Sequence, residues 1–126
     1  PLACSVALKV IEIIKRDKLD ENARNVGDYI KGELIRLSQS YPSVIKAVRG
    51  LGLIIGIELQ EKEKNPAFSS SQKTASSQVT DMLQKEGLLV IPSGAQVIRL
   101  LPPLNISKDE AKQGLGIIEK VVSSLK

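Results

Sequence analysis

The sequence predicts an α+β fold in which a small, mainly antiparallel sheet of three to four strands carries helices on one face. Segments with apolar residues three and four apart alternate with short segments rich in β-branched residues. Their order is helix, helix, strand, strand, helix, strand, strand, helix. Because the strands come in pairs instead of alternating strictly with helices, an α+β layer is favoured over a parallel α/β sheet. The 126 residues suffice for one domain, so residues 1–126 are taken as a single unit.

Two amphipathic helices are predicted at the start of the chain. Over residues 3–16 the apolar positions recur at spacings of three and four, with charged side chains off that stripe. The same pattern begins again at Leu19 and ends before Tyr41, with two acidic residues in the first turn, where they favour the helix dipole. We therefore expect two helices in succession.

A hairpin should follow. Residues 44–50 and 51–59 are rich in β-branched side chains, and the glycines at positions 50 and 52 permit a tight or bulged reversal between the strands. Residues 60–71 are polar and contain Asn65-Pro66 and a serine run, so we expect a surface loop there.

The second half should contain two helices around a second strand pair. Apolar spacing over residues 75–83 predicts a helix, and Gly87 is placed to end it. Residues 88–91 and 96–101 are strand candidates, the second ended by Pro102-Pro103. Ser107, followed three residues later by Glu110, forms a capping box for a final helix.

Two absences limit the chemistry of this chain. It contains no histidine, which excludes a histidine general base, a Ser/His/Asp or Cys/His nucleophile and any histidine-containing metal site. The single cysteine, Cys4, can form neither an internal disulfide nor a metal-binding cluster, and we expect it to be a small packed residue. Nothing in the chain requires an oxidising compartment, so we expect a cytoplasmic protein without a metal site.

The charge pattern argues against two classes of partner. Eighteen basic residues against fourteen acidic ones give a net charge of +4, but they are scattered, and aromatic residues amount to 2%. A nucleic-acid module usually has a basic face and exposed aromatic side chains, so no nucleic-acid partner is expected. No apolar stretch approaches the roughly 20 residues that span a bilayer. Because the chain opens at Pro1, already in helical sequence, we expect it to be a fragment of a longer protein.

Arg99 is the most informative polar residue. Strand alternation places it on the same face as Val97 and Leu101, with apolar neighbours on either side. A half-buried arginine on a rigid strand can bind a carboxylate through two parallel N–H donors. An edge-strand arginine that reaches water is the alternative, and position alone does not decide between them.

Other candidate chemical groups have simpler explanations. Lys46 is the only lysine within a predicted strand, and a solvated strand face explains it better than a Schiff-base role. The glycines at 50 and 52 do not precede a helix, so hairpin geometry explains them better than phosphate binding. Three carboxylate pairs fall in first helical turns or a polar loop and are rejected as catalytic dyads: Asp20/Glu21, Glu61/Glu63 and Asp109/Glu110.

Three segments taken together carry a family resemblance: residues 1–4, residues 48–59 and residues 87–104, which include Arg99-Leu100-Leu101-Pro102-Pro103. In this order they resemble the C-terminal small domain of class III pyridoxal-phosphate-dependent aminotransferases, most closely those of the acetylornithine type. The resemblance spans essentially the whole chain.

The resemblance implies a fold type I enzyme whose larger domain, outside residues 1–126, carries the Schiff-base lysine and most of the pyridoxal 5′-phosphate pocket. It implies no catalytic and no cofactor-binding residue in this chain, a homodimeric full-length enzyme, and amino-acid and 2-oxo-acid substrates. Of the family's functional residues only Arg99 carries over, as the clamp for the substrate α-carboxylate. The chain alone is expected to be inactive.

The resemblance further implies transfer of an amino group between N-acetylornithine and 2-oxoglutarate. Residues 93–96 read Ser-Gly-Ala-Gln, where acetylornithine enzymes often have Ala-Gly-Pro-Asn. Ornithine, succinylornithine and 4-aminobutyrate therefore stay open as substrates. A free-standing α+β module that binds a carboxylate, and a purely structural interaction domain, are the alternatives from other functional classes.

Overall fold

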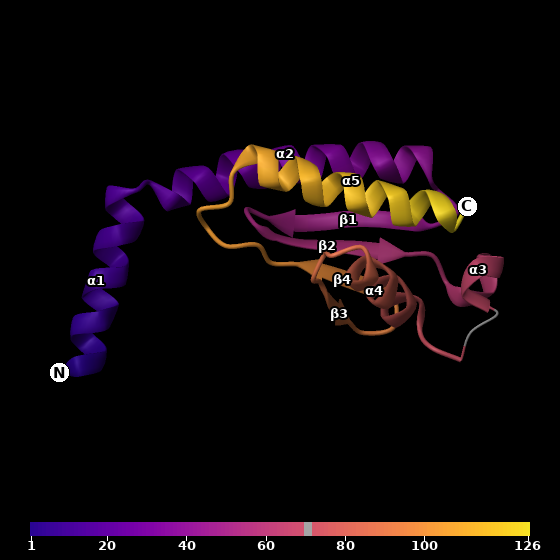
Figure 1. Cartoon of the computed structure of the whole chain (residues 1–126), viewed down its shortest axis with the longest axis horizontal. Coiled ribbons are helices and arrows are strands. Elements are labelled where there is room, and N and C mark those ends of the chain that lie inside the picture. Colours follow the sequence, from indigo (N-terminus) through magenta and orange to yellow (C-terminus); the bar gives the residue numbers. More distant parts are fainter. Residues whose placement is uncertain (70–71) are drawn as a thin grey trace.

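The computed structural model describes residues 1–69 and 72–126 and confirms the predicted α+β class (Figure 1). Its four strands form one antiparallel sheet in the order β1-β2-β4-β3. The elements of the described residues are α1 (Leu2–Arg16), α2 (Leu19–Ser40), β1 (Ile45–Leu51), β2 (Ile54–Leu59), the 3₁₀ helix η1 (Lys62–Lys64), α3 (Pro66–Ser69), α4 (Ala75–Lys85), β3 (Ile91–Ser93), β4 (Val97–Leu100) and α5 (Lys108–Ser124).

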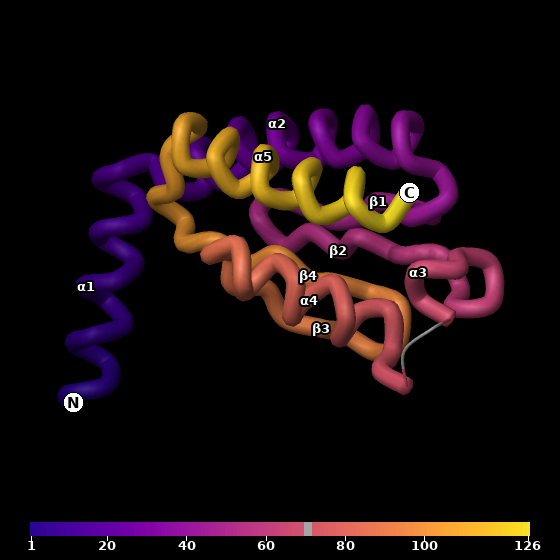
Figure 2. The backbone as a smooth tube through the Cα atoms, turned by 45° about the vertical axis from the view of Figure 1, so that its right-hand side comes forward, coloured from indigo at the N-terminus to yellow at the C-terminus, as the bar shows by residue number. Residues whose placement is uncertain are grey.

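Three helices cover one face of the sheet. α2 and α5 lie side by side, with α2 against β1 and β2, while α4 contacts α5, β3 and β4 (Figures 1 and 2). The core forms between these helices and the sheet, where Ile55, Ile57 and Ile98 are buried against apolar side chains of the helices. Because successive strand residues point to opposite faces, residues 54, 56, 58, 97 and 99 lie on the other face. No described helix covers that open face.

The hairpin between β1 and β2 turns slightly later than the sequence predicts. Leu51 pairs with Ile54, so the reversal falls at Gly52-Leu53, and Gly52 has a φ of +54°. α2 passes very close to this turn: a Cβ added at Gly27 would lie only 2.2 Å from the Gly52 carbonyl oxygen. The glycine on the helix thus allows the turn to pack directly on α2.

Two local predictions are wrong. Of the predicted surface loop over residues 60–71, residues 70 and 71 lie outside the described residues. Residues 60–69 are not simply a surface loop, because Asn65 and Phe68 are buried. The Asn65 side chain donates to the carbonyl oxygens of Ser43 and Leu125, which joins this segment to the core. The first strand of the second pair comprises Ile91–Ser93 and not residues 88–91, since Leu88 and Val90 pack against the core instead and Leu89 is exposed.

The final helix begins as predicted. The Ser107 hydroxyl accepts from the Glu110 backbone N–H at 3.2 Å, and the Glu110 carboxylate accepts from the Ser107 backbone N–H at 2.8 Å. Both bonds satisfy groups that a helix start leaves unpaired.

Helix α1 stands apart from the rest of the molecule (Figure 1). None of its residues is buried, and even the apolar side chains of Leu2 and Leu8 are 80% and 69% exposed. Cys4 is therefore exposed and not packed as expected, because no described element covers this helix. Among the described helices, none combines the length and the apolar character needed to cross a bilayer.

Candidate substrate-contacting face

The open face of the sheet carries a row of four residues in direct cross-strand register. Arg49 on β1 pairs with Gly56 on β2, Gly56 with Arg99 on β4, and Arg99 with Ile91 on β3. Cross-strand partners share a face and lie about 5 Å apart. Two arginines therefore flank a glycine in the middle of the sheet.

Arg99 occupies an interior strand and is exposed. The predicted face is right, since Arg99 alternates with the buried Ile98. The half-buried state is not found, because nothing in the described chain covers this face. An edge-strand position is not found either, since β4 lies between β2 and β3. Within residues 1–69 and 72–126, the Arg99 guanidinium makes no hydrogen bond and no ion pair, which leaves its five donors available to an external anion.

Arg49, the other arginine of the row, already has an ion-pair partner. Glu58, on the same face one register step away, pairs with Arg49 and with the Lys46 ammonium at 2.9 Å. The Glu58 side chain is only 14% exposed beneath these two cations. Lys46 thus lies on a solvated strand face, as predicted, and its ammonium group is held in an ion pair. Arg99 is therefore the arginine of this row that has no ion-pair partner among the described residues.

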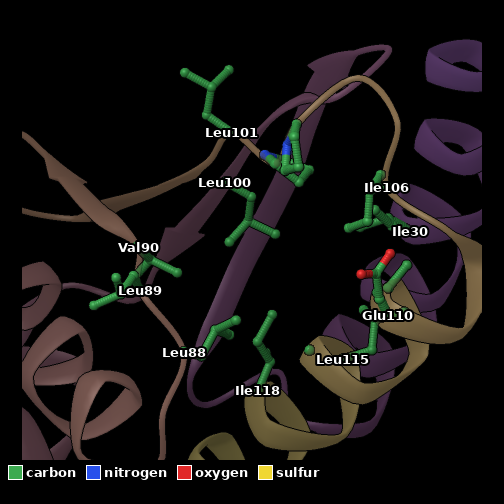
Figure 3. A pocket seen from close by; sticks show the side chains of 14 residues that line it. Ile30, Leu88, Leu89, Val90, Leu100, Leu101, Ile106, Glu110, Leu115 and Ile118 are labelled. Carbon is green, nitrogen blue, oxygen red and sulfur yellow. The ribbon is translucent and has the colours of Figure 1, made fainter. Parts of the chain in front are cut away.

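A pocket of the described chain lies on the opposite side of the sheet (Figure 3). It has a volume of about 300 Å³, and its lining is almost entirely apolar. Leu100 points into it beside Leu88 and Ile118. The adjacent Arg99 does not line it, because strand alternation turns that side chain to the open face. Glu110 is its one charged lining residue, and that carboxylate is engaged by Ser107. The pocket therefore offers no free polar group to a charged substrate.

The other carboxylates do not form a site. Over the described ranges, no three potential ligands converge on a metal position. Glu61 is paired with Lys64, and Glu110 belongs to the capping box, whose hydrogen bonds from the Ser107 backbone and hydroxyl lower the pKa of that carboxyl. Both carboxylates are thus held by neighbours close in sequence.

Comparison with known proteins shows the family of the chain. The model for aminotransferase class-III matches residues 1–122. The chain belongs to the class III aminotransferase family. It is 37% identical to acetylornithine aminotransferase of Thermosynechococcus vestitus over 99% of this chain and 28% of that protein, and 37% identical to ornithine aminotransferase of Staphylococcus carnosus over 98% and 27%. In structure it resembles acetylornithine aminotransferase from Elizabethkingia anophelis, with a TM-score of 0.86 and 29% identity over 98% of this chain and 29% of that one.

This aminotransferase chain thus spans under a third of the length of the curated relatives it matches. The described residues do not by themselves fit pyridoxal 5′-phosphate: Lys46, the strand lysine, is bound to Glu58, and the apolar pocket lacks a cationic group for a phosphate.

Sequence reasoning on this class III chain missed Glu58 and Gly56. Strand alternation over residues 54–59 puts both on the face opposite to the apolar Ile55 and Ile57, and the cross-strand register brings that face beside Arg99.

Proposed function

We propose that this chain is the C-terminal small domain of a pyridoxal-phosphate-dependent aminotransferase that transfers an amino group between N-acetylornithine and 2-oxoglutarate. Its contribution is Arg99, which binds the substrate α-carboxylate. The observation that carries this proposal is the exposed, unpartnered guanidinium on an interior strand of a class III chain. Ornithine, succinylornithine and 4-aminobutyrate stay as alternative amino donors, since relatives with acetylornithine and ornithine activities are equally similar in sequence.

The chemical role of this chain is positioning. Arg99 donates two parallel N–H bonds to the carboxylate, and the planar fork fixes the direction of the carboxylate as well as its place. β4 holds the Arg99 backbone between β2 and β3, so the anchor is rigid. Holding the carboxylate fixes the neighbouring carbon, which lowers the entropic part of the barrier.

We propose that the cofactor is bound by a part of the enzyme outside this chain. Pyridoxal 5′-phosphate, used by class III aminotransferases, supplies the electron sink for the reaction. The catalytic lysine and the cofactor pocket belong to the larger part of the enzyme, which is proposed to be a cytoplasmic homodimer.

Substitution of Arg99 tests the proposal. In the full-length enzyme, Arg99→Lys keeps the charge but loses the bidentate fork. We therefore expect KM to rise for both the amino-acid and the 2-oxo-acid substrate, corresponding to a loss of about 2–4 kcal/mol of binding free energy. Steady-state kinetics measure this change. Arg24→Lys is the matched control, because Arg24 is likewise exposed and has no ion pair among the described residues. Unchanged KM values for Arg99→Lys would contradict the carboxylate role.

A further inference from the structure

Gly56 lies where a glycine is unfavourable unless something requires it. It occupies the interior of β2, a central strand of the sheet. Glycine at such a position destabilises a strand, because it has no side chain to pack and loses more conformational freedom on folding.

Neither the backbone nor the packing of this chain requires glycine at position 56. Its φ lies outside the left-handed range, unlike that of Gly50 or Gly52. A Cβ built there would meet Val97 Cγ1 at 3.4 Å and the Arg49 carbonyl oxygen at 3.9 Å, and both are ordinary contacts. Gly27, by contrast, would place a Cβ 2.2 Å from a backbone oxygen. Nothing in the described chain therefore requires glycine at position 56, and an interior strand glycine can mark a site where a ligand approaches closely.

The charges around Gly56 indicate what approaches. On one side Arg49 is paired with Glu58, and on the other Arg99 is free to bind an anion. A ligand carboxylate is therefore drawn to the Arg99 side of the row. The carbon next to it then lies over the backbone of β2, at the position that lacks a side chain.

We infer that Gly56 is a positioning residue: its missing side chain provides the space over β2 in which the carbon chain beside the Arg99-bound α-carboxylate lies. The inference rests on the proposed function and adds a determinant of substrate fit. The ligand class is a 2-oxo acid or amino acid whose α-carboxylate adjoins the reacting carbon.

Two acceptors test the inference in the full-length enzyme. 2-Oxoglutarate has the α-carboxylate, whereas 4-oxobutanoate keeps a carbonyl group but lacks that carboxylate. Gly56→Val should raise KM for 2-oxoglutarate by about tenfold or more, because the added methyl groups occupy the substrate's place. KM for 4-oxobutanoate should change by less than about twofold, since that acceptor is not held at Arg99.

Two further variants separate substrate fit from a general disturbance. Ala47→Val adds methyl groups to the same open face, one register step away beside Glu58, and should leave both KM values unchanged. In an Arg99→Ala background, Gly56→Val should add little to KM for 2-oxoglutarate, because the two changes act on one bound carboxylate. A disturbance of the sheet alone would act equally in both backgrounds.

The outcomes are distinguishable. If Arg99→Ala raises KM for 2-oxoglutarate but Gly56→Val does not, or raises it equally for both acceptors, the inference on Gly56 is overturned while the proposed function stands. If Arg99→Ala has no effect, the proposed function and the inference both fail. Should Gly56→Val not fold, Gly56→Ala decides: its Cβ fits 3.4 Å from Val97, and a rise of about threefold for 2-oxoglutarate alone is expected.

Discussion

At the scale of single residues, two glycines of α2 have opposite requirements. A Cβ at Gly27 would lie 2.2 Å from the Gly52 carbonyl oxygen, whereas a Cβ at Gly32 would meet nothing within 4 Å. The first glycine permits a backbone contact, and the second only raises the entropic cost of forming a helix.

Alanine substitutions at these two positions should therefore change stability in opposite directions. Gly27→Ala should lower the free energy of unfolding by about 1–3 kcal/mol, because a backbone must move to accept the methyl group. Gly32→Ala should raise it by about 0.5–1 kcal/mol, because alanine has the higher helix propensity. Urea denaturation of the chain measures both. A loss at Gly32 as large as that at Gly27 would show that the close contact with Gly52 is not the cause.

Arg99 shows how far single residues can be predicted from sequence. Its face followed from strand alternation, which depends only on the local pattern. Its exposure did not follow, because exposure depends on what covers the sheet. Gly56 and Glu58 were missed for a related reason: their closeness to Arg99 and Arg49 depends on the cross-strand register, which the local pattern does not fix.

At the scale of elements, the start of α5 was predicted to the residue. Ser107 and Glu110 satisfy each other's backbone N–H groups, and this arrangement needs only residues close in sequence. Residues 60–69 were mispredicted because their polar sequence contains one buried aromatic side chain, Phe68, and one buried amide, Asn65. The partners of Asn65, Ser43 and Leu125, are distant in sequence.

Loss of the capping hydroxyl should destabilise α5. Ser107→Ala removes the acceptor for the Glu110 backbone N–H and should lower the free energy of unfolding by about 1 kcal/mol. Denaturation measures this loss. Ser124→Ala, near the other end of the same helix, also removes a hydroxyl but no N-terminal cap, and its effect should be smaller.

The capping box should also depend on pH. Hydrogen bonds from Ser107 lower the pKa of Glu110 below 4.5, its ordinary value. A carboxyl whose pKa is lower in the folded state stabilises the protein above the unfolded pKa, and this stabilisation is lost as the pH falls through the folded value. The stability difference between the native chain and Glu110→Gln should therefore narrow as the pH falls below about 4.5. Denaturation at several pH values tests it, and a difference independent of pH would contradict the role of the charged carboxylate.

At the scale of the whole molecule, the helices pack on one face of the sheet, and α1 and the open face are left uncovered. The apolar side of α1 should make the 126-residue chain associate as its concentration rises, or bind a hydrophobic dye. Replacing Leu2 and Val6, which lie one turn apart on this side and are 80% and 55% exposed, by glutamine should reduce both effects, whereas Lys9→Gln should not. Dye fluorescence and light scattering measure them, and a monomer that binds no dye would count against this expectation.

The short link between α1 and α2 determines the direction in which α1 extends from the rest of the molecule. Only Asp17 and Lys18 separate the two helices, and Lys18 has a φ of +50°, a left-handed conformation that is costly for a residue with a side chain. Fifteen residues of helix extend about 22 Å from this pivot. A rotation of about ten degrees at Lys18 would carry the far end of α1 through about 4 Å. The direction of α1 relative to α2 therefore depends strongly on the backbone torsion angles of Lys18.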